Sequence, residues 1–226
     1  RTFAQAPPSL REVWLASAAF ADRDYLVYQD ERRTYADSHR EVAALANWIR
    51  QQGIEPGDRV AIAMRNYPEW MLIYWACMTQ GIGCVGMNAW WVEEEMAYGL
   101  NDASPKALFC DEERLARFKN ISAGFPDMQV VGVRTSEAEG VMPYAEVLKT
   151  PGSLPECTVD PDADACIFYT SGTTGRPKGA QLTHLGCVSN IMNLAFFGRA
   201  ISTTMARVNN TPMPAPEDAP VLSGLV

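Results

Sequence analysis

The chain is organised around the stretch Tyr169-Thr170-Ser171-Gly172-Thr173-Thr174-Gly175-Arg176-Pro177-Lys178-Gly179. Four hydroxyl side chains fall within five residues, and three glycines allow the backbone to take positive φ angles and to approach a ligand closely. Lys178 adds a mobile positive charge that can follow phosphate oxygens. The stretch therefore predicts a loop that holds phosphate groups.

The flanks of this stretch define the kind of loop. Apolar residues 165–169 predict a buried strand, residues 179–182 predict a second strand, and Thr183 is a plausible N-cap for a helix over residues 185–197. A Walker loop instead needs Gly-Lys-Ser/Thr leading directly into a helix. Here Gly179 follows Lys178, so the Walker pattern fails. A plain surface hairpin is the alternative, but it needs no such density of hydroxyls and glycines.

Upstream, helix and strand patterns alternate along the chain. This alternation predicts an α/β fold with a mostly parallel sheet flanked by helices. Ser9 is a candidate cap for a short first helix, Asp37 for the next helix, and Gly53 for that helix's end. The expected elements are a hairpin (25–29 and 32–35), helices 37–53, 67–80 and 92–101, strands 60–64, 84–87, 107–110 and 128–133, and an exposed connector (150–164).

Several tempting motifs have simpler explanations. Residues 81–86 match Gly-x-Gly-x-x-Gly, but they follow a predicted helix and open a strand, the reverse of a dinucleotide-binding loop. Glu93, Glu94 and Glu95 fit the start of a helix better than a metal site. His184 is expected to cap or pack rather than to act as a base, and His39 is expected to lie on a polar helix face. Trp90 and Trp91 are candidates for the core or for the wall of a pocket, and the core is the preferred interpretation.

The composition excludes several classes of protein. The net charge of −8 argues against binding of nucleic acid or of acidic membranes, and no apolar run is long enough to span a membrane. The six cysteines form no Cys-x-x-Cys pair, so they are expected to be reduced thiols of a cytoplasmic protein.

The 169–179 stretch resembles, position for position, the nucleotide loop of the AMP-dependent synthetase and ligase family. These adenylate-forming enzymes include acyl-CoA synthetases, aryl-CoA ligases, luciferases and peptide-synthetase adenylation domains. Further segments stand in the order that the family shows: Arg33-Thr34-Tyr35, Gly57-Asp58-Arg59-Val60-Ala61-Ile62, Asn66-Tyr67-Pro68-Glu69-Trp70 and Gly86-Met87-Asn88.

The resemblance implies a two-step reaction in which a carboxylate attacks Mg·ATP to give an acyl-adenylate, and coenzyme A then takes the acyl group. It implies a catalytic role for Lys178, which would stabilise the departing pyrophosphate, and a place near Mg²⁺ for Ser171 or Thr173. A carboxylic acid, ATP and coenzyme A are the implied partners, and a homodimer stays open. The implied nucleotide-binding residues are Thr170, Ser171, Gly172, Thr173, Thr174, Gly175 and Lys178.

The family's later motifs, for adenine, ribose and the adenylation lysine, are not found in this sequence. Residues 1–226 are therefore expected to be the N-terminal portion of the AMP-binding domain, inactive alone and without the C-terminal domain. Within it, 1–155 form a first α/β part, 164–199 the loop with its strands and helix, and 200–226 a connector. The Asn88-Ala89-Trp90-Trp91 segment resembles fatty-acyl and aryl-CoA synthetases more than peptide-synthetase modules.

Three hypotheses remain open at this level. The first is an acyl-CoA synthetase fragment that carries the ATP phosphate loop. The second is a nucleotide-binding module without catalysis. The third is an unrelated phosphate-binding or interaction domain, which Mg·ATP binding that depends on Lys178 would exclude.

Overall fold

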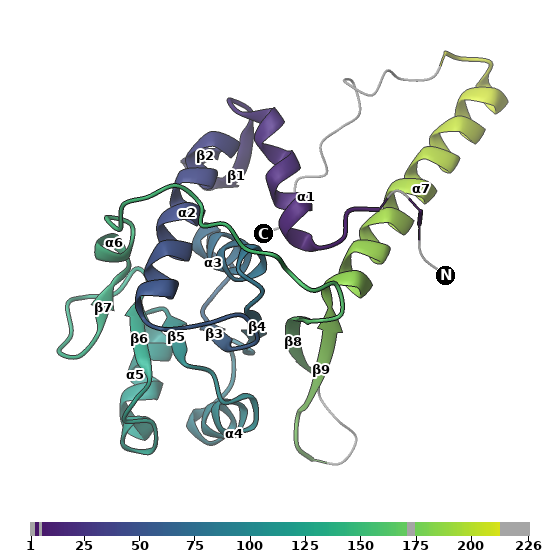
Figure 1. Ribbon diagram of the computed structural model, residues 1–226. Coiled ribbons are helices and arrows are strands. Elements are labelled where there is room, and N and C mark those ends of the chain that lie inside the picture. Colours follow the sequence, from purple (N-terminus) through teal and green to yellow (C-terminus); the bar gives the residue numbers. More distant parts are fainter. Residues whose placement is uncertain (1–2, 5, 171–174, 213–226) are drawn as a thin grey trace.

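The chain folds around a mostly parallel sheet with helices on both faces, as predicted (Figure 1). The computed structural model describes residues 3–4, 6–170 and 175–212. In this described part, seven strands lie in the order β7-β6-β5-β3-β4-β8-β9, and only the last pair is antiparallel. The strands are β3 (Arg59–Ala63), β4 (Gly83–Gly86), β5 (Ala107–Cys110), β6 (Gln129–Gly132), β7 (Met142–Pro143), β8 (Asp164–Thr170) and β9 (Lys178–Thr183), and a separate hairpin joins β1 (Asp24–Tyr28) to β2 (Glu31–Thr34).

The helices cover the sheet in two layers, each with its own apolar core. Alternate residues of β3 point to opposite faces: Val60 and Ile62 join the core beneath α2 and α3, whereas Ala61 and Ala63 join the core beneath α4 and α5. Strands buried on both faces explain the continuous apolar runs in the sequence. The helices are α1 (Leu10–Ala16), α2 (Tyr35–Gln51), α3 (Pro68–Thr79), α4 (Glu93–Ala103), α5 (Glu112–Ile121), α6 (Tyr144–Val147) and α7 (His184–Asn209), with 3-10 turns at Ser17–Phe20 and Ser122–Gly124.

The helix ends correct one prediction and confirm others. Helix α2 is capped by Thr34, not by Asp37. The Thr34 hydroxyl accepts the Asp37 N–H at 3.0 Å, and the Asp37 carboxylate accepts the Thr34 N–H at 3.1 Å. Asp37 is thus the third helical residue of a capping box. Ser9 caps α1 as predicted, and Gly53, with φ of 70°, follows the end of α2.

Some elements were missed. The segment that forms α5 is rich in charged residues, and the segments that form β7 and α6 are short. None of these three elements was predicted from the sequence. Helix α7 continues to Asn209 instead of stopping at residue 197, and it extends away from the sheet (Figure 1). No helix in the described ranges combines the length and the apolar character needed to cross a membrane.

His39 was predicted on a polar face, and that was wrong. Its ring stacks on Trp14 at a centroid distance of 4.2 Å, and its Nε2 lies 3.0 Å from the Ser17 hydroxyl. The polar face was inferred from α2 alone, whereas α1 folds over that face and buries part of it. All six cysteines are free in the described structure, and four of them are buried.

An ionic network ties the β1–β2 hairpin to the main body. The Arg134 guanidinium donates to both Glu31 oxygens, at 2.8 and 2.7 Å, and to Glu69 Oε2 at 3.1 Å. Arg33 donates to the same buried Glu69 at 3.2 Å. Glu69 lies on α3, so its carboxylate fixes the hairpin relative to the helices that cover the sheet.

Candidate functional site

The predicted phosphate-holding stretch joins β8 to β9. Thr170 ends β8 and Lys178 begins β9, and the two residues are register partners, with the Thr170 hydroxyl 3.4 Å from the Lys178 carbonyl oxygen. Gly175 has φ of 87°, the conformation for which glycine was expected. Ser171, Gly172, Thr173 and Thr174 lie outside the described residues. The flanking strand, strand and helix, with Thr183 as N-cap of α7, agree with the prediction.

The topology places the described ends of this stretch at the carboxyl edge of the sheet. Strands β4 and β8 are parallel neighbours, and Gly86 pairs with Phe168, so the residues that follow both strands meet at one edge. From that edge the chain leaves β4 for β5, on one side, and leaves β8 for β9, on the other. Open α/β sheets bind ligands at such points, where successive connections diverge from the carboxyl ends of adjacent strands.

A hollow of about 310 Å³ lies at this edge. Its wall combines aromatic rings with an amide, a hydroxyl and a carboxylate, a mixture that suits a ligand with both an apolar and a polar part. It is lined by Asn88, Trp90, Trp91, Glu95, Tyr169, Thr170 and Pro177. Thr170, at the end of β8, and Pro177, which directly precedes β9, thus share one rim.

Tyr169 anchors the floor of this hollow. Its hydroxyl donates to Asp102 Oδ2 at 2.7 Å, and its ring packs edge-on against Trp91 at 5.1 Å. Burial, followed by the hydrogen bond to Asp102, raises the pKa of Tyr169 above its ordinary value of 10.0. The phenol therefore stays neutral at physiological pH and holds the strand end in place.

The loop after β4 forms the opposite wall. Trp91 is buried, as preferred from the sequence. Trp90 is 68% exposed and lines the hollow, so the core preference was wrong for Trp90 and the pocket-wall alternative describes it. The Arg65 guanidinium lies 4.0 Å from the Trp90 ring. Glu93, Glu94 and Glu95 form the first turn of α4, and Glu95 accepts the Val92 N–H at 3.1 Å, which confirms their helix-start role.

Sequence reasoning missed the arginines around this loop. Arg114 and Arg117 of α5 donate to the carbonyl oxygens of Ala89 and Trp91. One signal was available, because Asp111 follows a buried strand directly and caps a charged segment. Residues at that place in a parallel sheet lie at the ligand-binding edge.

The positive charges of the hairpin are available to an anion. Lys178 is exposed and has no ion-pair partner among the residues that the structure describes. The Arg176 guanidinium lies over the Tyr98 ring at 5.5 Å. His184 takes no part, because it is buried and its Nδ1 accepts the Leu10 N–H at 3.3 Å, which is the packing role expected for it.

The residues 81–86 have the placement expected from the sequence. They follow α3 and include β4, and Gly81 has φ of 64° between helix and strand. Because they open no helix, they lack the helix N-terminus that a dinucleotide-binding loop requires.

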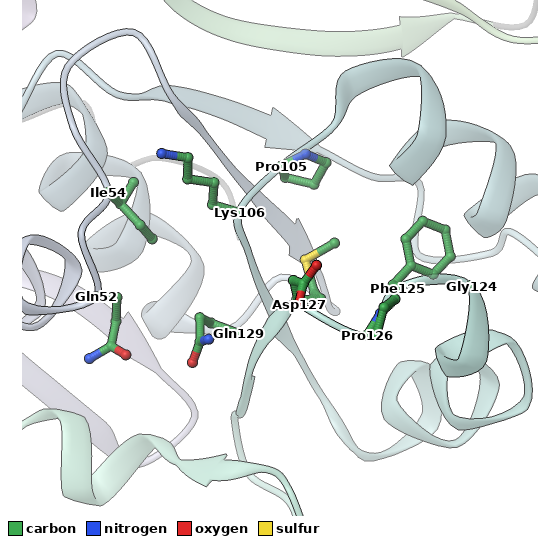
Figure 2. Close-up of a pocket in the computed structure, with 10 residues that line it drawn as sticks. Gln52, Ile54, Pro105, Lys106, Gly124, Phe125, Pro126, Asp127 and Gln129 are labelled. Atoms are coloured by element: carbon green, nitrogen blue, oxygen red, sulfur yellow. The ribbon is translucent and has the colours of Figure 1, made fainter.

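A larger hollow, of about 430 Å³, lies at the opposite edge of the sheet. Figure 2 shows Lys106, Pro126, Asp127 and Gln129 around it, near the amino ends of β5 and β6. The ammonium of Lys106 is already paired with Asp58 at 2.7 Å. We therefore place the candidate site at the smaller hollow beside the hairpin, because of the chemical character of the residues that line it.

Within residues 3–4, 6–170 and 175–212, no group of three His, Cys, Asp or Glu side chains is arranged to hold a metal ion. The residue assigned to Mg²⁺ from the sequence, Ser171, is not among those described.

Comparison with known proteins finds similar sequences. A family profile described as AMP-binding enzyme matches residues 13–214. Feruloyl-CoA synthase of Amycolatopsis sp is 33% identical over 161 residues, which are 71% of this chain and 30% of that protein. Medium-chain fatty-acid–CoA ligase of Escherichia coli is 31% identical over 186 residues, 78% of this chain and 33% of that protein. The chain spans about a third of the length of these relatives.

Solved structures share the fold. An anthranilate CoA ligase in complex with anthranoyl-AMP superposes with a TM-score of 0.75 at 21% identity, over 80% of this chain and 36% of that one. A long-chain-fatty-acid-CoA ligase from Archaeoglobus fulgidus also gives 0.75, at 22% identity, over 86% of this chain and 40% of that one.

Proposed function

Because the chain belongs to the AMP-binding enzyme family, we propose that the protein containing it activates a carboxylic acid with ATP and passes the acyl group to coenzyme A. The observation that carries the proposal is the 169–179 stretch, whose described ends form a hairpin at the diverging carboxyl ends of β4 and β8. The family match and this placement support the same chemistry independently.

In the proposed first step, a carboxylate oxygen attacks the α-phosphorus of ATP. The bond from that phosphorus to the bridging oxygen breaks, and pyrophosphate leaves with the electron pair. Negative charge therefore grows on the leaving group, and the exposed ammonium of Lys178 is suited to stabilise it. The hydroxyls of residues 170–174 and the backbone N–H groups between the glycines would hold the phosphates.

In the proposed second step, the thiol sulfur of coenzyme A attacks the acyl carbonyl carbon, and AMP leaves. Mg²⁺ would enter with ATP and neutralise phosphate charge. It prefers oxygen ligands, and the Thr170 hydroxyl at the hollow is a ligand of that kind. We assign Ser171 or Thr173 to the same ion.

The acid is the open part of the proposal. The relatives named above act on an aromatic acid and on medium-chain fatty acids, according to their names. Aromatic side chains beside polar groups in the 310 Å³ hollow suit either class. A panel of short, medium, long-chain and aromatic acids is therefore needed.

The test is acid-dependent exchange of pyrophosphate into ATP by the full-length gene product. We expect exchange with one class of acid, and a loss of about 10²- to 10³-fold in kcat for Lys178→Ala, the loss typical of one transition-state charge contact. Lys149→Ala is the matched control, because Lys149 is exposed and pairs only with Glu146 in the described structure.

Other results would overturn the proposal in distinct ways. Binding of Mg·ATP without exchange for any acid would indicate a nucleotide-binding module without catalysis. Binding indifferent to Lys178→Ala would indicate that the hairpin is not the phosphate site.

A further inference from the structure

The loop from Asn88 to Val92 has little support from its own backbone. It contains no strand or helix, and its internal contacts are the Trp91 N–H to the Asn88 carbonyl, at 3.1 Å, and the Trp90 N–H to the Asn88 side chain, at 2.9 Å. Yet three of its side chains line the candidate ligand hollow. Something outside the loop must fix its position, because a connection of this kind is otherwise mobile.

Two arginines of α5 supply that support. Arg114 donates through Nε to the Ala89 carbonyl oxygen at 2.7 Å and through Nη2 to the same oxygen at 2.5 Å. Arg117 donates through Nη1 to the Trp91 carbonyl oxygen at 2.7 Å and to that of Ala89 at 3.2 Å. The planar guanidinium presents several donors in a fixed geometry, so two such groups define the path of the loop.

The Arg114 guanidinium is itself held rigidly. Its side chain is 3% exposed and pairs with Asp111, which is 5% exposed, at 3.1 Å. The other Asp111 contacts reach the same region, because its carboxylate accepts the Arg65 N–H at 3.0 Å, and the Arg65 side chain lies on Trp90. A buried ion pair gains little net stability, since desolvation offsets the attraction. The Arg114–Asp111 pair therefore contributes mainly by fixing the position of the guanidinium, and little by adding stability.

We propose that Arg114 and Arg117 are positioning residues for the ligand site: by fixing the carbonyls of Ala89 and Trp91 they hold the wall formed by Asn88, Trp90 and Trp91 against Tyr169 and Thr170. They touch no ligand themselves. The inference rests on the proposed function, because the ligands of the hollow are taken to be Mg·ATP and the acid.

The test compares two substitutions on one helix in the full-length gene product. Arg117→Gln removes the guanidinium from the loop, and Arg117 is 24% exposed, so its loss leaves no buried charge without a partner. Glu113→Gln is the matched control. It removes the acid that pairs with both arginines and, at 3.8 Å, with Arg65, but it leaves the bonds of the two arginines to the loop carbonyls and the contact of Arg65 with Trp90 in place.

We expect Arg117→Gln to raise KM for Mg·ATP or for the acid about tenfold while kcat changes less than about threefold, since a displaced wall weakens binding before it alters the reacting groups. Arg114→Lys should have a similar effect. It keeps a positive charge beside Asp111 but lacks the fork that reaches Ala89. Glu113→Gln should leave both KM values unchanged.

A second measurement does not depend on the catalytic activity of the protein. Amide hydrogen exchange over residues 89–92 should become faster by about tenfold in Arg117→Gln and stay unchanged in Glu113→Gln. Unchanged KM values and unchanged exchange in Arg117→Gln would overturn the inference. If the wild-type protein promotes no pyrophosphate exchange with any acid, the proposed function fails instead, and the hydrogen-exchange comparison alone decides whether the arginines hold the loop.

Discussion

At the scale of single residues, Gly99 shows how packing can reverse a local preference. It lies in α4, where alanine is ordinarily favoured over glycine by about 1 kcal/mol. A Cβ at this position would lie 2.6 Å from Cζ3 of Trp91 and 3.0 Å from Cε of Met87. We predict that Gly99→Ala lowers the free energy of unfolding by about 1–3 kcal/mol, because the buried Trp91 ring must move. Urea denaturation measures this change.

Gly198 supplies the matched comparison. It is an exposed helical glycine in α7, and a Cβ there would meet nothing within 4 Å. Gly198→Ala should raise the free energy of unfolding by about 0.5–1 kcal/mol. If both substitutions stabilised the protein equally, Trp91 would not be packed against α4 as described.

At the scale of elements, the start of α2 depends on a reciprocal pair of hydrogen bonds between Thr34 and Asp37. Thr34→Ala should cost about 1 kcal/mol of unfolding free energy, because the Asp37 N–H at the helix start loses its acceptor. Thr34→Ser keeps the hydroxyl and should cost only a small part of that. Thermal unfolding of the two variants checks the prediction. An equal loss in both would assign the effect to the threonine methyl group instead.

At the scale of the whole molecule, His184 connects α1 and α7, two helices that lie far apart in the sequence. Its buried Nδ1 accepts the Leu10 N–H, and in this way α1 is docked on the start of α7. Burial lowers the pKa of His184 below its ordinary value of 6.5, although the charge of Glu12 opposes this shift. The folded state therefore binds this proton less readily than the unfolded state does.

Stability from the neutral imidazole is complete above pH 6.5 and is lost as the pH falls below that value towards the folded-state pKa. We predict that Tm falls between pH 7.5 and pH 5.5, and that His184→Asn, which keeps an acceptor but cannot titrate, flattens this dependence. His39→Gln is the control, because burial lowers the pKa of His39 as well. If His39→Gln flattened the profile and His184→Asn did not, the effect would belong to the α1–α2 contact.

Much of the fold was readable from local pattern. Apolar runs identified the strands β3 to β6 to within about two residues, because strands buried on both faces have to be apolar throughout. The helix α5 was missed because Leu115 and Phe118 are its only buried apolar residues, a pattern too sparse to stand out among charged residues. The cap of α2 was misplaced by three residues, because Thr34 and Asp37 are both good capping residues and only the backbone geometry separates them.

The sequence by itself determined the sheet with its flanking helices, the family, and the candidate phosphate residues around Lys178, since these depend on residue types and spacing within short segments. Only the tertiary structure decided which segments meet at the site. The exposure of Trp90, the clamp of Arg114 and Arg117 on the loop after β4, and the stacking of His39 on Trp14 each join residues from different elements. The physical reason is that crossover connections and strand order, which no local pattern encodes, bring distant residues to the same edge of a parallel sheet.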